Sequence, residues 1–200
     1  MVRDGDHLLM SVVGRSSVRT TSVAGLALLL AVGLHLLAAP AASATPYCGQ
    51  VWGSQPEVVG TAPGGQLRAV RTGRHECFDR IVLDAVHFVS SYSVQYVDVV
   101  TEQGTGAAVP VRGGARLAVV PNVGHALWPT PATGASMADV SGYRTFRDVV
   151  WAGSADRVTT IGLGVRARLP FRTFLLPGPG NGSRLVVDVA HQWCDPGTTC

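Results

Sequence analysis

No lysine occurs in this sequence of 200 residues, and only three residues are glutamate. Lysine and glutamate are among the best helix formers at exposed positions, so their scarcity argues against a helical bundle. The missing lysine also excludes a Schiff-base enzyme, a Ser-x-x-Lys acylation site and a P-loop, because each needs a lysine amine. The composition therefore excludes several functions before it indicates one.

Short catalytic motifs are missing as well. The sequence has no G-x-S-x-G, no H-E-x-x-H and no H-x-x-E-H, which excludes the nucleophile elbow of serine hydrolases and the common zinc-hydrolase helices. A glycosidase needs two carboxylates roughly 5 to 10 Å apart, and nothing in the sequence selects such a pair. The candidate aspartates are Asp79, Asp84, Asp98, Asp148, Asp156 and Asp188. We interpret Asp79 and Asp188 as charges at strand ends or edges, and we expect no catalytic residue, cofactor or metal.

Valine is abundant, with 30 copies, and 24 glycines and 12 prolines punctuate the chain. A chain rich in this β-branched residue and in turn residues is typical of short strands joined by turns. Hydrophobic residues make up 46% of the sequence and charged residues 14%, which argues against disorder. Two hundred residues leave room for one domain of ordinary size. The composition therefore predicts a single all-β domain.

Eight short apolar stretches separated by turn residues have the spacing of a sandwich or barrel. The predicted strands cover residues 67–73, 78–86, 92–101, 115–121, 145–151, 158–168, 171–176 and 184–190. No stretch has a convincing helical period, although residues 140–149 have room for a short helical turn.

The clearest alternation lies in the predicted strand 158–168. One face carries Ile161, Leu163, Val165 and Ala167, and the other carries Gly162, Gly164, Arg166 and Arg168. This pattern is typical of a half-buried antiparallel strand. The strand 184–190 repeats it, with Asp188 on the face opposite its apolar residues. We expect each of these strands to expose one face.

The first 44 residues have the order of a secretory signal. Three arginines precede an apolar run over residues 23–39, and a small-residue stretch follows up to Ala44. The run is slightly shorter than the roughly 20 residues that span a bilayer, so we expect cleavage after Ala44, with an uncleaved anchor as the alternative. A start at Met10 instead of Met1 would change only this leader.

The mature part, residues 45–200, carries 13 arginines and 11 acidic residues. This excess is too small for a dedicated nucleic-acid binder. An Arg-for-Lys bias also follows from a GC-rich genome, so it does not by itself indicate function.

All four cysteines lie in the mature part, and an even number in an exported chain favours disulfides. Three pairings are possible. We predict Cys48 with Cys77, and Cys194 with Cys200, because the second pair flanks turn residues that bring its ends together. The alternative for the first pair is a metal site built from Cys48, His75 and Cys77.

One long connection, residues 121–143, interrupts the strands, and connections of this length are usually functional or mobile. Trp128 lies in its middle. An exposed tryptophan there would stack on a sugar ring or fill a partner's pocket, whereas a buried one would be a lid on the sandwich edge.

Four blocks of sequence resemble the AMIN-like domain of exported actinobacterial proteins, which is related to the AMIN domain of cell-wall amidases and of secretion and pilus proteins. They cover residues 71–86, 92–100, 109–120 and 146–193. The most specific part is LPFRTF at 169–174, followed by a Pro/Gly turn and RLVVDV at 184–189. The resemblance implies a small antiparallel β-sandwich that is not a catalyst and that localises its host to the envelope through peptidoglycan.

Together these observations predict a signal peptide over residues 1–44, an N-terminal extension over 45–66, an AMIN-like sandwich over 67–193 and a tail over 194–200. We expect a disulfide-stapled all-β domain on the extracellular side, without a membrane span after signal cleavage and without a nucleic-acid partner.

The predicted function is that of a non-catalytic, secreted module that binds peptidoglycan or an envelope protein. Arginine forks suit carboxylates and an aromatic ring suits sugars, so Arg166, Arg168 and Trp128 are the candidate ligand-binding residues. We expect Gly162 and Gly164 to leave the strand face beside the arginines open to an extended ligand, although these glycines would equally admit a second sheet. A secreted inhibitor of a protease or lytic enzyme, acting through residues 121–143, is the alternative function, and a hydrolase acting on muropeptides is a third.

Overall fold

A computed structural model describes residues 47–62 and 64–193, which are almost entirely β-structure. The predicted all-β class is therefore confirmed. The elements are η1 Tyr47–Gly49, a short 3-10 helix, and the strands β1 Glu57–Val59, β2 Gly64–Arg74, β3 Phe78–Val86, β4 Tyr92–Val97, β5 Val100–Thr101, β6 Ala108–Val109, β7 Ala115–Pro121, β8 Val123–His125, β9 Phe146–Ala155, β10 Val158–Val165, β11 Phe171–Pro177 and β12 Ser183–Ala190.

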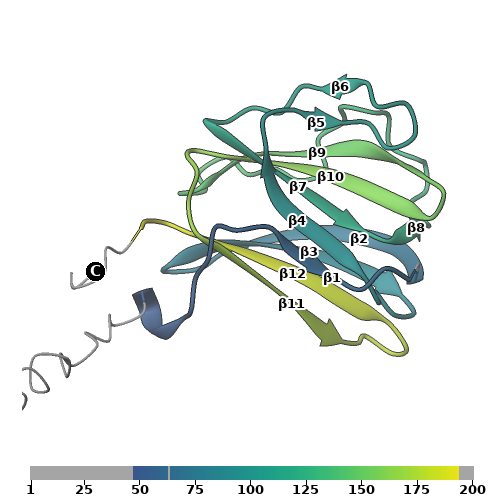
Figure 1. Cartoon of the computed structure of the whole chain (residues 1–200), viewed down its shortest axis with the longest axis horizontal. Helices are drawn as coiled ribbons and strands as arrows, with labels where there is room; N and C mark the ends of the chain where they lie inside the picture. The colour runs from purple at the N-terminus through teal and green to yellow at the C-terminus, as the bar shows by residue number, and fades with distance from the viewer. Residues whose placement is uncertain (1–46, 63, 194–200) are drawn as a thin grey trace, which may run out of the picture. The chain divides into compact units, whose positions relative to one another are not determined.

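Ten of these strands form two five-stranded sheets that pack face to face (Figure 1). The first sheet has the order β1-β4-β7-β10-β9, and the second sheet has the order β11-β12-β3-β2-β8. Neighbouring strands are antiparallel except for β2 and β8, which run parallel. The predicted β-sandwich is confirmed.

The strand predictions hold best where an apolar pattern is long. The predicted strands 78–86 and 115–121 have the bounds of β3 and β7, while the predicted strand 92–101 divides into β4 and β5. The pattern does not predict β1, β6 or β8, each of which has three residues or fewer. Within residues 140–149 the chain makes a turn, closed by a 3.2 Å bond from the Tyr143 amide to the Val140 carbonyl, and then enters β9.

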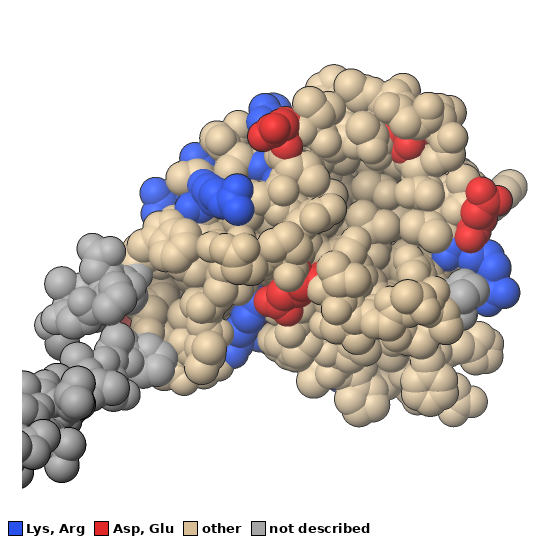
Figure 2. All heavy atoms as spheres, viewed as in Figure 1, with Lys and Arg blue, Asp and Glu red and all other residues tan. Residues whose placement is uncertain are grey.

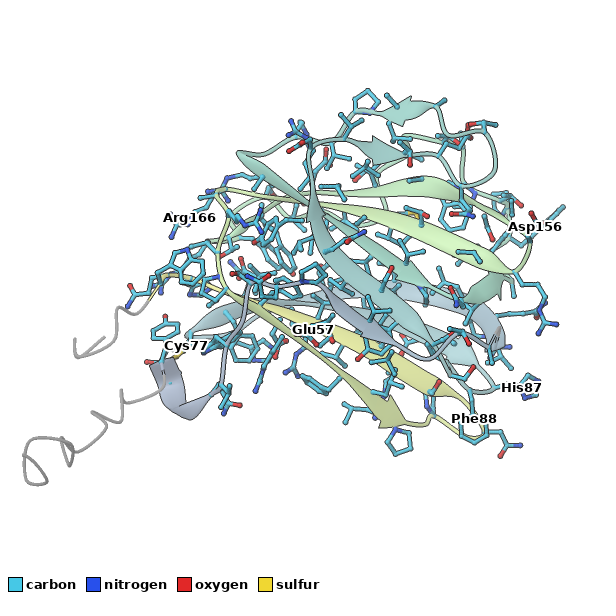
Figure 3. All side chains as sticks on the ribbon, viewed as in Figure 1. Glu57, Cys77, His87, Phe88, Asp156 and Arg166 are labelled. Carbon is cyan, nitrogen blue, oxygen red and sulfur yellow. A yellow bond between two sulfur atoms is a disulfide. The ribbon has the colours of Figure 1, made fainter. Side chains whose placement is uncertain are left out.

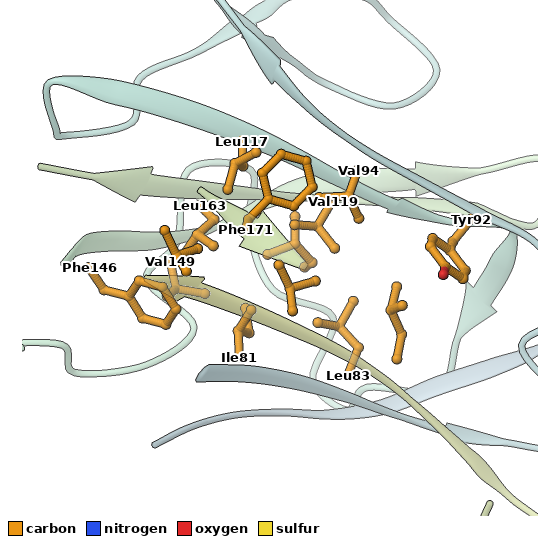
Figure 4. Close-up of a cluster of buried hydrophobic side chains, with 14 of the residues drawn as sticks. Ile81, Leu83, Tyr92, Val94, Leu117, Val119, Phe146, Val149, Leu163 and Phe171 are labelled. Carbon is orange, nitrogen blue, oxygen red and sulfur yellow. The ribbon is translucent and has the colours of Figure 1, made fainter. Parts of the chain in front are cut away.

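The core lies between the two sheets and is built from the inward side chains of both (Figure 4). In β3, buried Ile81, Leu83 and Ala85 alternate with partly exposed outward residues. Each fully buried aliphatic or aromatic side chain contributes roughly 1.5 to 3 kcal/mol through the hydrophobic effect. The largest fully buried side chains are those of Trp151, Phe146, Phe171, Leu67, Ile81, Leu83, Leu117, Ile161, Leu163 and Leu185.

A second, smaller apolar cluster covers the outer face of the first sheet. Figure 1 shows β5 and β6 lying outside β9 and β10. The cluster consists of Val100, Val109, Val111, Val150 and Ala152. Because this cluster covers the sheet, β10 is buried on both faces, and the prediction that it exposes one face is wrong.

Gly162 and Gly164 allow this covering segment to approach β10. A Cβ atom at Gly162 would lie 2.8 Å from a methyl group of Val111, and one at Gly164 would overlap the carbonyl oxygen of Arg112. These glycines therefore serve close packing inside the chain. The expectation that they leave an open face for a ligand is wrong.

The disulfide between Cys48 and Cys77 is present, with the two Cα atoms 6.4 Å apart. It links η1 to the turn between β2 and β3, and it excludes the alternative metal site at these cysteines. A cross-link across 29 positions stabilises a fold by roughly 3 to 4 kcal/mol in the chain-entropy model. The predicted partners Cys194 and Cys200 lie outside the described residues.

The predicted signal peptide, its cleavage site and the two alternative start positions also lie outside the described residues. The segment predicted as an N-terminal extension contributes η1, β1 and the first residues of β2 to the sandwich. In the described part of the chain, no helix has the length and apolar character needed to cross a membrane.

Candidate functional site

The antiparallel strands place alternate connections at opposite ends of the sandwich. At one end β2, β4, β10 and β12 finish and β3, β7, β9 and β11 begin. Figure 3 shows Cys77 and Arg166 at this end, and His87, Phe88 and Asp156 at the other. We call the first the basic end, because seven arginines lie on its strand termini and loops. They are Arg74, Arg112, Arg116, Arg144, Arg147, Arg166 and Arg168.

Figure 2 shows arginine atoms gathered at the upper left of the surface, on the side where Figure 3 labels Arg166. Of the seven arginines, Arg112 pairs with a carboxylate, that of Asp148 at 3.2 Å, and the other six make no ion pair within residues 47–62 and 64–193. The hydrogen bond to Asp148 raises the pKa of the Arg112 guanidinium. A cluster of unneutralised guanidinium groups attracts anions.

Three hollows follow one another around the basic end. They have volumes of about 370, 650 and 350 Å³. The 370 and 650 Å³ hollows share Arg112, and the 650 and 350 Å³ hollows share Gly142, so the three hollows adjoin one another, and we call them together the basic groove. The arginines that line it, in this order, are Arg116, Arg112, Arg147, Arg144 and Arg74.

The predicted site residues Arg166 and Arg168 lie in the loop after β10 and not within the strand. The Arg166 amide donates to the Thr145 carbonyl at 2.8 Å, and its guanidinium donates to the His191 carbonyl. The guanidinium carbon of Arg168 lies 4.8 Å from the ring centre of Tyr96. Both arginine side chains are exposed. The loop is thus anchored to the sandwich while its charges face solvent.

Tyr96, whose ring packs against the Arg168 guanidinium, is itself held in place by hydrogen bonds. Its hydroxyl donates to the Leu169 carbonyl at 2.6 Å and accepts from the Leu169 amide at 2.9 Å. Burial raises the pKa of Tyr96 to about 12, so the ring stays neutral at physiological pH. A neutral, hydrogen-bonded ring holds the loop in place and offers its face to the arginine.

Trp128 is 93% exposed, so the interpretation as a lid is wrong. Its loop is tied to both sheets: β8 pairs with β2, and the Gly134 amide donates to the Trp151 carbonyl at 2.9 Å. Residues 126–133 therefore project from two fixed points. Trp128 lines none of the three hollows of the basic groove, and the structure does not bring it together with the predicted arginines.

Another tryptophan lies next to Arg168. The indole of Trp193 donates to the Arg168 carbonyl at 2.8 Å, and its side chain is 52% exposed. Sequence reasoning missed this residue because it follows the last predicted strand and belongs to no pattern. The positions of two groove arginines could have been predicted from the sequence. Arg74 follows one predicted strand and Arg144 precedes another, and in a sandwich the end of one strand and the start of the next lie at the same end of the fold.

A buried carboxylate supports the floor of the basic end. Asp79 is 1% exposed, and its Oδ2 accepts from the amides of Thr145 at 2.6 Å and Phe146 at 3.1 Å. Its Oδ1 lies 3.2 Å from Nε2 of His191, whose Nδ1 lies 3.1 Å from the Glu76 carbonyl oxygen. Asp79 therefore does more than mark a strand terminus: it joins the second sheet to the start of β9.

The geometry of the basic end suits binding. Among the described residues, no three His, Cys, Asp or Glu side chains gather as a metal site would require. The arginines are spread along three adjoining surface hollows, each with a volume of about 350 to 650 Å³, as expected of a site for an extended ligand.

The fold and this site describe a disulfide-bonded β-sandwich with an exposed basic end. The family model of the AMIN-like domain matches residues 65–191, so the chain belongs to the AMIN-like domain family. The match includes strands β2 to β12 and the arginines of the basic end. AMIN-like domains are generally non-catalytic, and membership suggests a cell-wall-associated binding module with an extracellular or periplasmic envelope location. No curated protein matches the chain.

Proposed function

We propose that this chain is a secreted, non-catalytic module that binds the cell envelope, with peptidoglycan as its ligand, and that it makes the contact with its basic end. The observation that carries the proposal is the set of six exposed or partly exposed arginines without a carboxylate partner among the described residues. Peptidoglycan presents carboxylates at a high density, and guanidinium forks bind carboxylates in a bidentate geometry.

In this proposal Arg166 and Arg168 are the first contacts, because both project from an anchored loop. Preorganised donors bind with a smaller entropy loss than flexible ones. Trp128 contributes a separate contact from residues 126–133, where its exposed ring is free to stack on a sugar. Residues 1–44 supply the export signal, and the residues that follow the cleavage site carry the binding domain.

Sedimentation with purified cell-wall sacculi tests the proposal. We expect the wild-type protein to be retained, and the double variant Arg166→Gln/Arg168→Gln to bind at least about tenfold more weakly, since a hydrogen bond to a charged group contributes roughly 1.5 to 3 kcal/mol. Arg157→Gln is the control, because it removes an exposed guanidinium at the opposite end that pairs with no carboxylate in the described part of the chain. Equal retention of the double variant and the control would refute the role of the basic end.

One observation favours a second candidate function, inhibition of a protease or lytic enzyme. The ring of Trp128 is 93% exposed on a loop fixed at both ends, which suits insertion into a partner's cleft. Replacing residues 126–133 by a short Gly-Ser linker should then abolish inhibition without changing sacculus binding. Release of muropeptides by the purified wild-type protein would instead show a hydrolase.

A further inference from the structure

The lining of the basic groove indicates which part of a wall polymer it contacts. A site for sugar rings needs an aromatic face that is open to the ligand. The aromatic rings that line the groove are those of Tyr143, Phe146 and His75. Phe146 is fully buried, and the His75 ring is stacked on Phe78 with ring centres 4.5 Å apart. The Tyr143 ring is stacked on Phe146, with ring centres 5.8 Å apart and planes inclined by 6°. The Arg74 guanidinium lies over the same ring, 5.9 Å from its centre.

The hydroxyl of Tyr143 is also engaged, because it makes a 2.9 Å hydrogen bond with Oγ1 of Thr72. The ring and the hydroxyl of Tyr143 therefore stabilise the side of the groove, and the ring is not available to stack on a sugar. The exposed tryptophans, Trp128 and Trp193, line none of the three hollows. Among the described residues, the lining of the groove contains no tryptophan and no tyrosine other than Tyr143, whose ring and hydroxyl are already engaged.

The groove instead offers donors for anions along its whole length. Five arginines line it, and Ser136 and Ser141 add hydroxyl groups in the 650 Å³ hollow. Each hollow also has one exposed carboxylate: Asp98 in the 370 Å³ hollow, Asp139 in the 650 Å³ hollow and Glu76 in the 350 Å³ hollow. The Asp139 carboxylate accepts a hydrogen bond from the Ser141 amide at 2.8 Å. An anionic position among cationic ones suits a ligand that carries an ammonium group as well as carboxylates.

We propose that the basic groove binds the peptide stems of the wall through their carboxylate and ammonium groups and leaves the glycan strand outside. This inference rests on the proposed function and makes it specific, since it names the part of the polymer that is bound. The planar fork of a guanidinium matches the two oxygens of a carboxylate, and the linked hollows accommodate an extended peptide.

Three wall preparations test the inference: intact sacculi, sacculi freed by acid of phosphodiester-linked polymers, and glycan strands from which an amidase has removed the peptides. We expect equal binding to the first two and at least tenfold weaker binding to the third. Chemical amidation of the stem carboxylates should weaken binding to the same extent.

The outcomes separate the inference from the proposed function. Unchanged binding to peptide-free glycan would overturn the peptide-stem inference and leave the envelope module standing. Loss of binding after acid treatment would show that phosphodiesters are the ligand and would also overturn it. Failure to bind intact sacculi would overturn both.

A variant pair locates the contact in the groove. Arg74→Gln/Arg144→Gln removes two exposed guanidinium groups that hold no carboxylate in the described part of the chain, and Arg157→Gln is again the control. We expect the double variant to stay folded, with a melting temperature slightly below that of the wild type because Arg74 loses its contact with the Tyr143 ring. We expect it to bind intact sacculi about tenfold more weakly and to lose the preference for peptide-bearing wall. A double variant that keeps this preference would refute the groove as the site.

Discussion

Arginine has two different roles on two surfaces of this domain. On the outer face of the second sheet, Arg80 and Arg172 lie on either side of Asp188 and are paired with it. At the basic end, Arg166 and Arg168 face solvent without a carboxylate partner in the described residues. The arginine-rich composition is therefore not one signal, and the placement of each guanidinium decides whether it stabilises the fold or is available to a ligand.

On the outer face of the second sheet, ion-paired side chains pack against aromatic rings. Asp188 has a fully buried side chain and accepts from Arg80 at 2.6 and 2.9 Å and from Arg172 at 2.9 Å. Hydrogen bonding to Asp188 raises the pKa of the Arg80 guanidinium. Both guanidinium groups lie 5.2 to 5.4 Å from the ring centres of Phe78 and Phe174. The prediction that Asp188 is an edge charge is therefore wrong, because its partners cover it in the middle of the sheet.

The largest effect on stability should come from breaking these ion pairs. Asp188→Asn removes the one anion between two partly buried guanidinium groups, and loss of one partner from a buried ion pair costs about 3 to 5 kcal/mol. Urea unfolding measures the loss as a lower midpoint. Asp156→Asn is the control, since Asp156 is exposed in a tight turn at a φ of 50°, which asparagine tolerates. Similar midpoints for the two variants would contradict the structural role of Asp188.

The next effect should come from Asp79, the buried carboxylate of the basic end. Asp79→Ala leaves the amides of Thr145 and Phe146 buried without an acceptor, at a cost of about 2 to 4 kcal/mol. Asp79→Asn keeps one acceptor oxygen for both amides and should cost less. The comparison uses urea midpoints, and an asparagine variant as unstable as the alanine variant would show that the charge matters more than the hydrogen bonds.

A smaller loss is expected at the covered face of the first sheet. Gly164→Ala places a methyl group against the backbone of Arg112, and overpacking of this kind costs about 1 to 3 kcal/mol. Gly124 is a matched control, because it lies in β8 with open space around its Cα. Thermal unfolding should separate the two alanine variants. If both variants unfold at the wild-type temperature, the backbone of Arg112 is not packed against Gly164 as closely as the structure shows.

Gly162 and Gly164 show which features of the fold cannot be predicted from the sequence pattern. Strand periodicity is a local property, so β3 and β7 are read correctly from it. Whether the outer face of a strand is open depends on segments far away in the chain, and Gly162 and Gly164 give no local sign of the β5–β6 hairpin above them. Asp188 was misread for the same reason, since both of its arginine partners lie on other strands.

The site was predictable to a similar extent. Arg166 and Arg168 are exposed, as predicted, but they lie in the loop after β10 and not on the face of a strand. The Cys48–Cys77 pairing could be predicted because the turn residues between Cys194 and Cys200 assign those two cysteines to each other and leave Cys48 for Cys77. The basic groove could not, because its largest hollow is shaped by the path of residues 136–143, and this path depends on loop contacts that no periodicity encodes.

Tyr96 gives a pH-dependent test of how the basic end is anchored. Its pKa is raised to about 12, so the folded state holds the phenol proton more tightly than the unfolded state. Its contribution to stability is therefore complete below pH 10 and is lost as the pH rises through about 12. In Tyr96→Phe the urea midpoint should fall less steeply between pH 10 and 12 than in the wild type. Parallel pH profiles would show that burial does not raise the pKa of the Tyr96 phenol and would contradict its burial in the folded state.

The smallest effect on stability is expected at the surface proposed to bind. Arg166→Gln/Arg168→Gln loses two hydrogen bonds to carbonyls, one to His191 and a long, exposed one of 3.5 Å to Ser54, and one exposed stacking contact on Tyr96, which together should cost about 1 kcal/mol. The same two-charge change at Arg80→Gln/Arg172→Gln leaves Asp188 buried without a cation and should cost at least about 3 kcal/mol. Urea midpoints measured side by side decide the comparison. A large loss in the first variant would make its arginines structural, and weaker sacculus binding by that variant would then no longer identify a binding surface.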